Sequence, residues 1–290
     1  MIQSVLCCIL IMLLSSTAAL VTPNRYSVFV EGSMTLSAAV GALVLTLLSE
    51  TGPWFAVIIS LLGSCFTGII VTMVSTVWTK REDGLMKGIA INLAAIGAAV
   101  LTARFVSVRS GGTAFNFMAL PQNNPWSVQI DSWHFNVFLP VGVLVLLIFY
   151  LPIGSRFKMR LCAAGDDEVA ATSIGLTVRK TRIIAALLSG CLSGFGGFGM
   201  VLVQKSFSFW LAAMGCGFLS IAAVSCGDGR AKPALLKAAL FGILYSIGFS
   251  SEANGLRSVI GLPSELLQGM PFIVCLIMLI IHDRQNAING

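Results

Sequence analysis

Long apolar runs separated by short charged stretches are the dominant pattern along this chain. A helix needs about 20 mostly apolar residues to cross the roughly 30 Å hydrocarbon core of a bilayer. The runs of this kind predict about nine membrane segments, at 2–21, 32–49, 54–79, 88–105, 135–152, 183–203, 207–226, 234–250 and 267–282. Two of them, 32–49 and 234–250, are short enough to be partial or tilted. We therefore expect an all-α fold, a polytopic transmembrane helix bundle of about 8–9 segments that forms one domain over 1–290.

The stretch 106–134 has few charges but does not fit a membrane segment. It is rich in Gly, Pro and Asn, which favour turns. Trp126 and Trp133 suit the membrane–water interface, so we expect an external loop over 106–134. Residues 2–20 end in small residues, as a signal peptide does, but no Lys or Arg precedes Arg25. A retained first membrane helix is therefore the favoured interpretation, with a signal peptide as the alternative.

Composition narrows the class of protein. Of the 290 residues, 57% are apolar or aromatic and 10% are charged, and the mean hydropathy is +0.92. A soluble domain carries about 25% charged residues, so a soluble scaffold, a nucleic-acid-binding domain and a disordered chain are excluded. The eight cysteines lie mostly in apolar runs and the two histidines are far apart, which predicts no metal site and no disulfide framework.

The distribution of Lys and Arg predicts the orientation of the chain. If 156–182 is cytoplasmic, alternation of the segments places 22–30, 80–87, 227–237 and 283–290 on the same side. Together these loops hold 14 of the 18 basic residues, all except Arg104, Arg109, Lys205 and Arg257. Cytoplasmic loops carry an excess of basic residues, so we expect the N-terminus outside and the C-terminus inside.

Few polar or flexible positions interrupt the membrane segments. Glu31, followed by Gly32, starts a segment, where a carboxylate either has a functional role or complements a helix N-terminus. Asn92 lies inside the fourth segment and either lines a polar path or, as is commoner, bonds to a neighbouring helix. Gly194 and Gly197 belong to a small-residue run in which Gly190 and Gly194 have a GxxxG spacing, and such a run suits close helix packing, or alternatively a hinge or a thin wall beside a pore. These five residues are the candidates for lining a solute path.

The motifs of common enzymes are missing from the chain. No GxxxxGK[ST] phosphate loop, GxSxG or HExxH motif occurs, and no pair of membrane carboxylates occurs. The sequence therefore predicts no catalytic residue, no cofactor and no ATP binding through a phosphate loop. A membrane-embedded enzyme is the least favoured interpretation.

The most informative hydrophilic stretch is 163–178, between two membrane segments. It predicts a short helix with Asp166, Asp167 and Glu168 in the first turn, where carboxylates complement the helix N-terminus. Gly175 follows at the position of a C-cap. A short helix of this kind suits docking against a soluble partner, and a simple connector is the equal alternative.

Several stretches carry a family resemblance, in matching order over residues 20–282. AAGDDEVAATSIGLTV and LSGCLSGFGGFG are similar to A-x-G-E-N-x-x-A-A-x-x-x-G-I-x-V and L-S-G-x-x-A-G-L-x-G. VFVEGSMTLSAAVGA and MKGIAINLAAIGAAV are similar to E-G-x-M-x-x-G-A and G-x-A-x-N-x-x-x-x-G. These patterns resemble permease subunits of bacterial ABC importers of the ribose-permease-like superfamily, nucleoside and simple-sugar branch. The chain departs from them at Asp167, where Asn is usual, and at Cys216, where the nucleoside branch commonly has Arg.

The resemblance implies an importer of several subunits in the bacterial cytoplasmic membrane. The expected partners are a second homologous permease chain, two ATP-binding subunits, an external solute-binding protein and the lipid bilayer, with no nucleic acid. Residues 163–178 become the cytoplasmic coupling helix, with the coupling residues Gly165, Asp166, Asp167, Glu168, Ala170, Ala171 and Gly175. A nucleoside is the first expectation for the solute, followed by riboflavin and a simple sugar. An ATP-independent secondary transporter or channel is the rival from another class.

Overall fold

The computed structural model of the protein describes residues 2–22, 28–48, 53–77, 84–109, 118–119, 127–130, 133–136, 138–150, 155–166, 168–204, 206–207, 215–228, 230–253 and 264–289. Each predicted membrane segment overlaps a helix: α1 (Ile2–Val21), α2 (Phe29–Leu47), α3 (Pro53–Val77), α4 (Gly84–Arg109), α5 (Phe138–Tyr150), α8 (Val178–Gln204), α9 (Cys216–Cys226), α10 (Ala231–Ala253) and α12 (Ser264–Asn289). Two further helices, α6 (Ser155–Asp166) and α7 (Glu168–Ser173), lie between α5 and α8. The predicted helical membrane bundle is confirmed.

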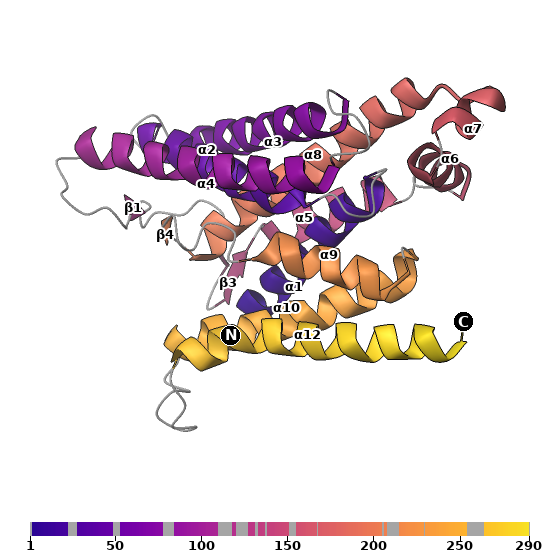
Figure 1. Ribbon diagram of the computed structural model, residues 1–290. Helices are drawn as coiled ribbons and strands as arrows, with labels where there is room; N and C mark the ends of the chain where they lie inside the picture. The colour runs from indigo at the N-terminus through magenta and orange to yellow at the C-terminus, as the bar shows by residue number, and fades with distance from the viewer. Residues whose placement is uncertain are drawn as a thin grey trace.

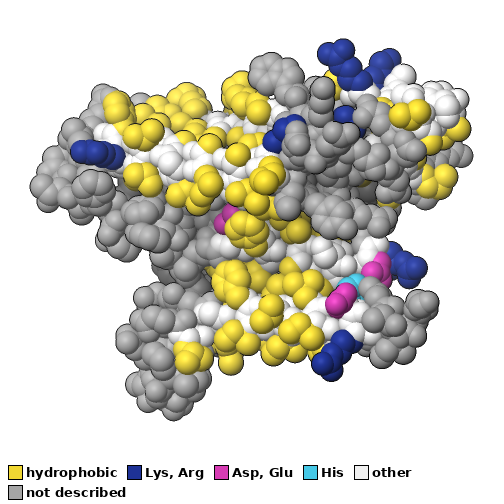
Figure 2. All heavy atoms as spheres, viewed as in Figure 1, with side chains coloured by type: hydrophobic (Ala, Val, Ile, Leu, Met, Phe, Trp, Pro, Cys, Tyr) yellow, Lys and Arg dark blue, Asp and Glu magenta, His cyan; other side chains and the backbone are white. Residues whose placement is uncertain are grey.

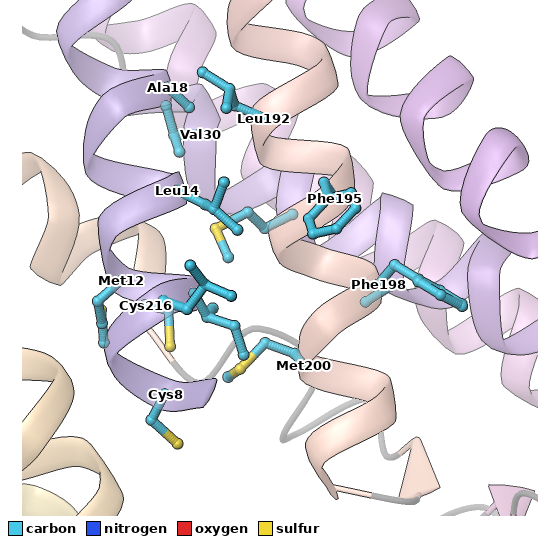
Figure 3. Close-up of a cluster of buried hydrophobic side chains, with 14 of the residues drawn as sticks. Cys8, Met12, Leu14, Ala18, Val30, Leu192, Phe195, Phe198, Met200 and Cys216 are labelled. Carbon is cyan, nitrogen blue, oxygen red and sulfur yellow. The ribbon is translucent and has the colours of Figure 1, made fainter. Parts of the chain in front are cut away.

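The helices are arranged in two layers around α1 (Figure 1). One layer contains α2, α3, α4 and α8, and the other contains α9, α10 and α12. Helix α1 lies between them and contacts both α8 and α10. Figure 3 shows apolar side chains of α1, including Leu14, directed towards α8. Helix α8 adds Phe195, Phe198 and Met200 to the same cluster of buried side chains. This shared apolar core joins the two layers.

Apolar side chains also cover much of the outer surface. Within the described residues, four helical stretches are long and apolar enough to cross a membrane: Phe29–Leu47, Trp54–Thr76, Met86–Phe105 and Val178–Val203. Rows of exposed apolar side chains follow α4 and α12 in Figure 2. Leu93 of α4 is 66% exposed and Leu276 of α12 is 60% exposed. Such surfaces suit a chain whose solvent is lipid, and the protein is a multi-pass membrane protein.

Two contacts show which helix ends share a side of the bundle. At one, Val21 at the end of α1 packs with Leu161 of α6 and Ala185 near the start of α8. In the second contact, Nε2 of His282 in α12 lies 3.0 Å from Oδ1 of Asp228, two residues after the end of α9. The ends of α1 and α12 therefore fall where the alternation of segments requires.

Short strands lie in the connections. Part of the predicted external loop forms a hairpin in which β2 (Ser127–Ile130) pairs antiparallel with β3 (Trp133–Asn136). Strand β1 (Met118–Ala119) pairs antiparallel with β4 (Ser206–Phe207), which joins this loop to the end of α8. Helix α4 also continues to Arg109, four residues into the region that we expected to be loop. The rest of 106–134 lies outside the described residues, and its external position stays a prediction.

The largest difference from the predicted segments is at 207–226. An apolar run of 20 residues predicts a full membrane crossing, but α9 begins only at Cys216, after Gly215 in the left-handed conformation with φ 74°. Its 11 residues span about 16 Å, roughly half of the hydrocarbon thickness. Its other end leads to Asp228, whose side chain is 58% exposed. The N-terminus of α9 therefore lies deep within the bundle.

Candidate functional site

Glu31 connects the first turn of α2 to the N-terminus of α9. Its side chain is 8% exposed, and its carboxylate accepts hydrogen bonds from three backbone N–H groups of α9. Oε1 lies 3.1 Å from the nitrogen of Gly215, and Oε2 lies 2.6 Å from that of Gly217 and 3.3 Å from that of Phe218. The first N–H groups of a helix have no partner within the helix, so the carboxylate caps α9 from another helix. Glu31 therefore lies at the N-terminus of α9 as well as in the first turn of its own helix. A functional role of the carboxylate and a purely capping role both remain open.

Glycines make this contact sterically possible. A Cβ on Gly217 would lie 2.5 Å from the Cα of Glu31, closer than real side chains approach. Gly215 has the positive φ that L-residues with side chains rarely adopt. The carboxylate also lies in the first turn of its own helix, so it faces the positive ends of two helix dipoles.

Asn92 of α4 caps α2 in a similar way. Its Oδ1 accepts a hydrogen bond of 2.7 Å from the backbone N–H of Gly32, and its Nδ2 donates one of 2.9 Å to the carbonyl of Val28. Val28 is the N-cap residue of α2 and offers no capping side chain. A Cβ on Gly32 would lie 2.6 Å from Asn92 Oδ1, so only glycine allows this approach. Of the two roles considered, Asn92 bonds to a neighbouring helix; a polar path stays a prediction.

We expect Asn92→Ala to destabilise the bundle without unfolding it. The substitution removes the buried hydrogen bond from the N–H of Gly32 and the part-buried one to the carbonyl of Val28, and an unmade buried hydrogen bond costs about 1–3 kcal/mol. The midpoint of thermal unfolding in detergent should fall by several degrees. Thr102→Ala, which removes only a bond within α4, is the control. Equal stability of the two variants would show that the amide contributes nothing to the start of α2.

Gly194 and Gly197 lie in helix–helix contacts. A Cβ on Gly194 would lie 2.6 Å from the carbonyl oxygen of Ser64 and 2.7 Å from the Cα of Cys65, both in α3. A Cβ on Gly197 would lie 2.4 Å from the carbonyl oxygen of Met34 in α2. The backbones of α2, α3 and α8 therefore touch, which is the packing role that the GxxxG spacing favours. A role in lining a path stays a prediction.

Hydroxyl and thiol groups add contacts across the same interior. Ser33 Oγ of α2 lies 2.7 Å from Ser193 Oγ of α8, and Ser15 of α1 hydrogen-bonds to Ser220 of α9. Cys216, in the first turn of α9, hydrogen-bonds to Tyr245 of α10. Spacing along the chain gives no signal for these pairs because the partners lie on different helices. The sequence therefore could not have shown that the N-terminus of α9 is a junction of α1, α2 and α10.

The predicted helix over 163–178 is two helices. Gly165 and Asp166 end α6, whereas Glu168 begins α7, so the acidic residues lie at a junction and not in one first turn; Asp167 lies outside the described residues. This prediction was therefore wrong in its boundaries.

The C-cap at Gly175 is in place. Gly175 has φ 82°, its N–H bonds to the carbonyl of Thr172, and the N–H of Leu176 bonds to the carbonyl of Ala171. This pair of bonds is a Schellman motif, which ends a helix with a glycine in the left-handed conformation. Ala171 is buried with Ala164 of α6. The motif fixes α7 at the start of α8.

The opposite side of α7 is exposed and carries apolar side chains beside the hydroxyls of Thr172 and Ser173. Val169 is 78% exposed and Ile174 is 72% exposed, and Ala170 is exposed between them. Among the described residues, no group of three or more His, Cys, Asp or Glu side chains is placed to hold a metal ion.

Known proteins resemble this chain over most of its length. The nucleoside ABC transporter permease protein NupC of Lactococcus lactis subsp. cremoris is 29% identical over 241 residues, 78% of this chain and 72% of its own length. The guanosine ABC transporter permease protein NupQ of Bacillus subtilis is 24% identical over 242 residues, 80% of this chain and 74% of its own. Among solved structures, PsaBC from Streptococcus pneumoniae in complex with Fab has a TM-score of 0.51 at 9% identity and covers 96% of this chain and 89% of that one, a likeness of fold alone.

A family defined by sequence matches nearly the whole bundle. Its description is branched-chain amino acid transport system / permease component, and the match covers residues 4–280, from the first turn of α1 to most of α12. The expected resemblance to importer permeases is confirmed. The chain is a transport subunit of this kind and belongs to the family of branched-chain amino acid transport system permease components.

Proposed function

We propose that the chain is the transmembrane subunit of an ATP-driven importer that moves a nucleoside into the cytoplasm by alternating access. The observation that carries the proposal is the match to transporter permeases over nearly all of the bundle, including two named for nucleoside or guanosine transport. Because the sequence has no phosphate loop, ATP hydrolysis belongs to separate subunits. The complex then comprises two permease chains, two ATP-binding subunits and an external solute-binding protein.

We assign the coupling role to α7 and the junction before it. The exposed apolar side of α7, with Val169 and Ile174, suits a cleft in an ATP-binding subunit, since exposed apolar patches mark contact sites. The predicted orientation, with the N-terminus outside and the C-terminus inside, places this surface in the cytoplasm. Closure of the ATPase dimer would move α7, and α8 would transmit the motion to α2 and α3 through its glycine contacts.

We place the solute path in the central hollow, the depression between α4 and α12 in Figure 2. Helix α9 belongs to the layer of α10 and α12 and also contacts α2 of the other layer (Figure 1). Phe218 in its first turn is 46% exposed, and an aromatic ring there suits stacking against a heterocycle. Glu31 and Asn92 support the wall from behind through their bonds to α9 and α2.

A secondary transporter or channel remains the rival from another class. Such proteins use buried carboxylates and broken helices at mid-depth, and the described residues include both features at Glu31 and α9. The carboxylate of Glu31, however, already accepts three backbone hydrogen bonds. A group held in this way is poorly suited to exchange a proton or a cation with the solute.

Copurification and binding test the proposal. We expect the permease to copurify with an ATP-binding subunit and its external binding protein to bind a nucleoside more tightly than riboflavin, ribose or galactose. Tight binding of riboflavin or a sugar instead would be consistent with an importer but would contradict a nucleoside as the solute. ATP-independent uptake by the permease alone would favour the secondary transporter.

A further inference from the structure

The N-terminus of α9 has the features of an anion site at mid-depth. Three backbone N–H groups, those of Gly215, Gly217 and Phe218, converge on one point. Helix N-termini attract anions because unpaired N–H groups and the helix dipole act together, and transporters use such ends of broken helices to hold anionic solutes. In this chain the converging donors hold a carboxylate of the protein itself.

The carboxylate of Glu31 is fixed in this position. It is 8% exposed, and the first turn of α2 adds a second positive helix end to that of α9. Beside it, Cys216 of α9 hydrogen-bonds to Tyr245 of α10. Loss of the negative charge at Glu31 would therefore leave converging donors and two positive helix ends beside Phe218.

We propose that Glu31 is a specificity-determining residue, whose carboxylate occupies the anion site of α9 and so leaves anionic solutes no binding point along the path. The inference rests on the proposed function, because it places the solute beside Phe218. Neutral solutes such as nucleosides pass this point without competing for the N–H groups. Phosphate-bearing solutes find the same groups already bonded.

The test uses Glu31→Ala, which removes the carboxylate that accepts the three N–H bonds. The permease is reconstituted in proteoliposomes with its ATP-binding subunits and binding protein. Uptake of the nucleoside that the binding protein binds is then measured in phosphate and in chloride of equal ionic strength. We expect phosphate to inhibit uptake by the variant at least about tenfold, the effect of about 1.4 kcal/mol of binding. Wild-type uptake and that of Ser33→Ala, which alters a buried hydroxyl bonded to Ser193, should change less than about twofold.

A second measurement separates this inference from the proposed function. The purified Glu31→Ala permease in detergent should gain thermal stability when phosphate is added, because an anion that binds only the folded state stabilises it. The wild-type permease should not. Phosphate-insensitive uptake or stability of the variant overturns the inference, as does a variant that fails to fold even in phosphate. Absence of ATP-driven uptake by the wild-type complex overturns the proposed function instead. The stability measurement then still decides whether Glu31 blocks an anion site.

Discussion

Gly194→Val should abolish the folded bundle. The new Cβ would lie 2.6 Å from the carbonyl oxygen of Ser64 and 2.7 Å from the Cα of Cys65. Both obstacles are backbone atoms of α3, so no side-chain rotation relieves the clash and the two helices must separate. Overpacking in a dense core costs about 1–3 kcal/mol and sometimes more, and the rigid backbone places this substitution at the upper end. We expect almost no monodisperse protein by size-exclusion chromatography in detergent.

Two other glycines provide matched controls for this prediction. A Cβ on Gly97 of α4 meets nothing within 4 Å, so Gly97→Val should accumulate like the unmodified protein. Gly196 is next but one to Gly194 on the same helix, and its Cβ would lie 3.4 Å from the flexible end of Met34. Gly196→Ala should therefore lower stability only slightly. Similar behaviour of Gly194→Val and Gly97→Val would contradict the close approach of α3 and α8.

The sequence predicted the helices well because the bilayer imposes one strong rule. Charged residues are costly in hydrocarbon, so the gaps between them mark the helices. The predicted segment 2–21 coincides with α1. The segment expected at 32–49 begins three residues earlier, at Phe29, because Glu31 has backbone partners that make it compatible with the interior.

The start of α9 could not be predicted by the same rule. Residues 207–226 are apolar throughout, and hydropathy does not distinguish a crossing helix from one that begins at mid-depth. The sequence does contain a local signal in Gly215-Cys216-Gly217, since closely spaced glycines mark turns and close approaches. The partner that explains those glycines, Glu31, lies 184 positions from Gly215. A single sequence carries no information about that pairing.

Asn92 shows the same limit in a milder form. Its residue type predicted a hydrogen bond to a neighbouring helix, and α4 does bond to α2 there. The sequence did not identify the partner, because the amide bonds to backbone groups, the carbonyl of Val28 and the N–H of Gly32, and nearly every residue carries such groups. Residue type thus predicted the interaction, and only the fold located it.

Ala170→Trp should uncouple ATP hydrolysis from solute uptake while leaving the permease folded. Ala170 is exposed on α7, between the exposed Val169 and Ile174, whereas Ala171 on the other side is buried. A Trp at 170 therefore adds bulk to the surface proposed to sit in the ATP-binding subunit without entering the core. Disrupting a well-packed contact centre costs about 2–3 kcal/mol, which corresponds to a roughly 30- to 150-fold loss of coupling.

The measurement compares uptake, ATP hydrolysis and thermal stability of the same reconstituted complex. We expect uptake to fall by at least about tenfold, the unfolding midpoint to stay unchanged, and ATP hydrolysis to lose its stimulation by the loaded binding protein. Ala94→Trp, the same change at an exposed alanine of α4, controls for added bulk on a surface away from α7. Its uptake should remain normal, because Ala94 is exposed and a Trp there enters no packed contact between helices. If Ala170→Trp transports as well as Ala94→Trp, α7 is a connector, and the motion that drives transport enters the bundle elsewhere.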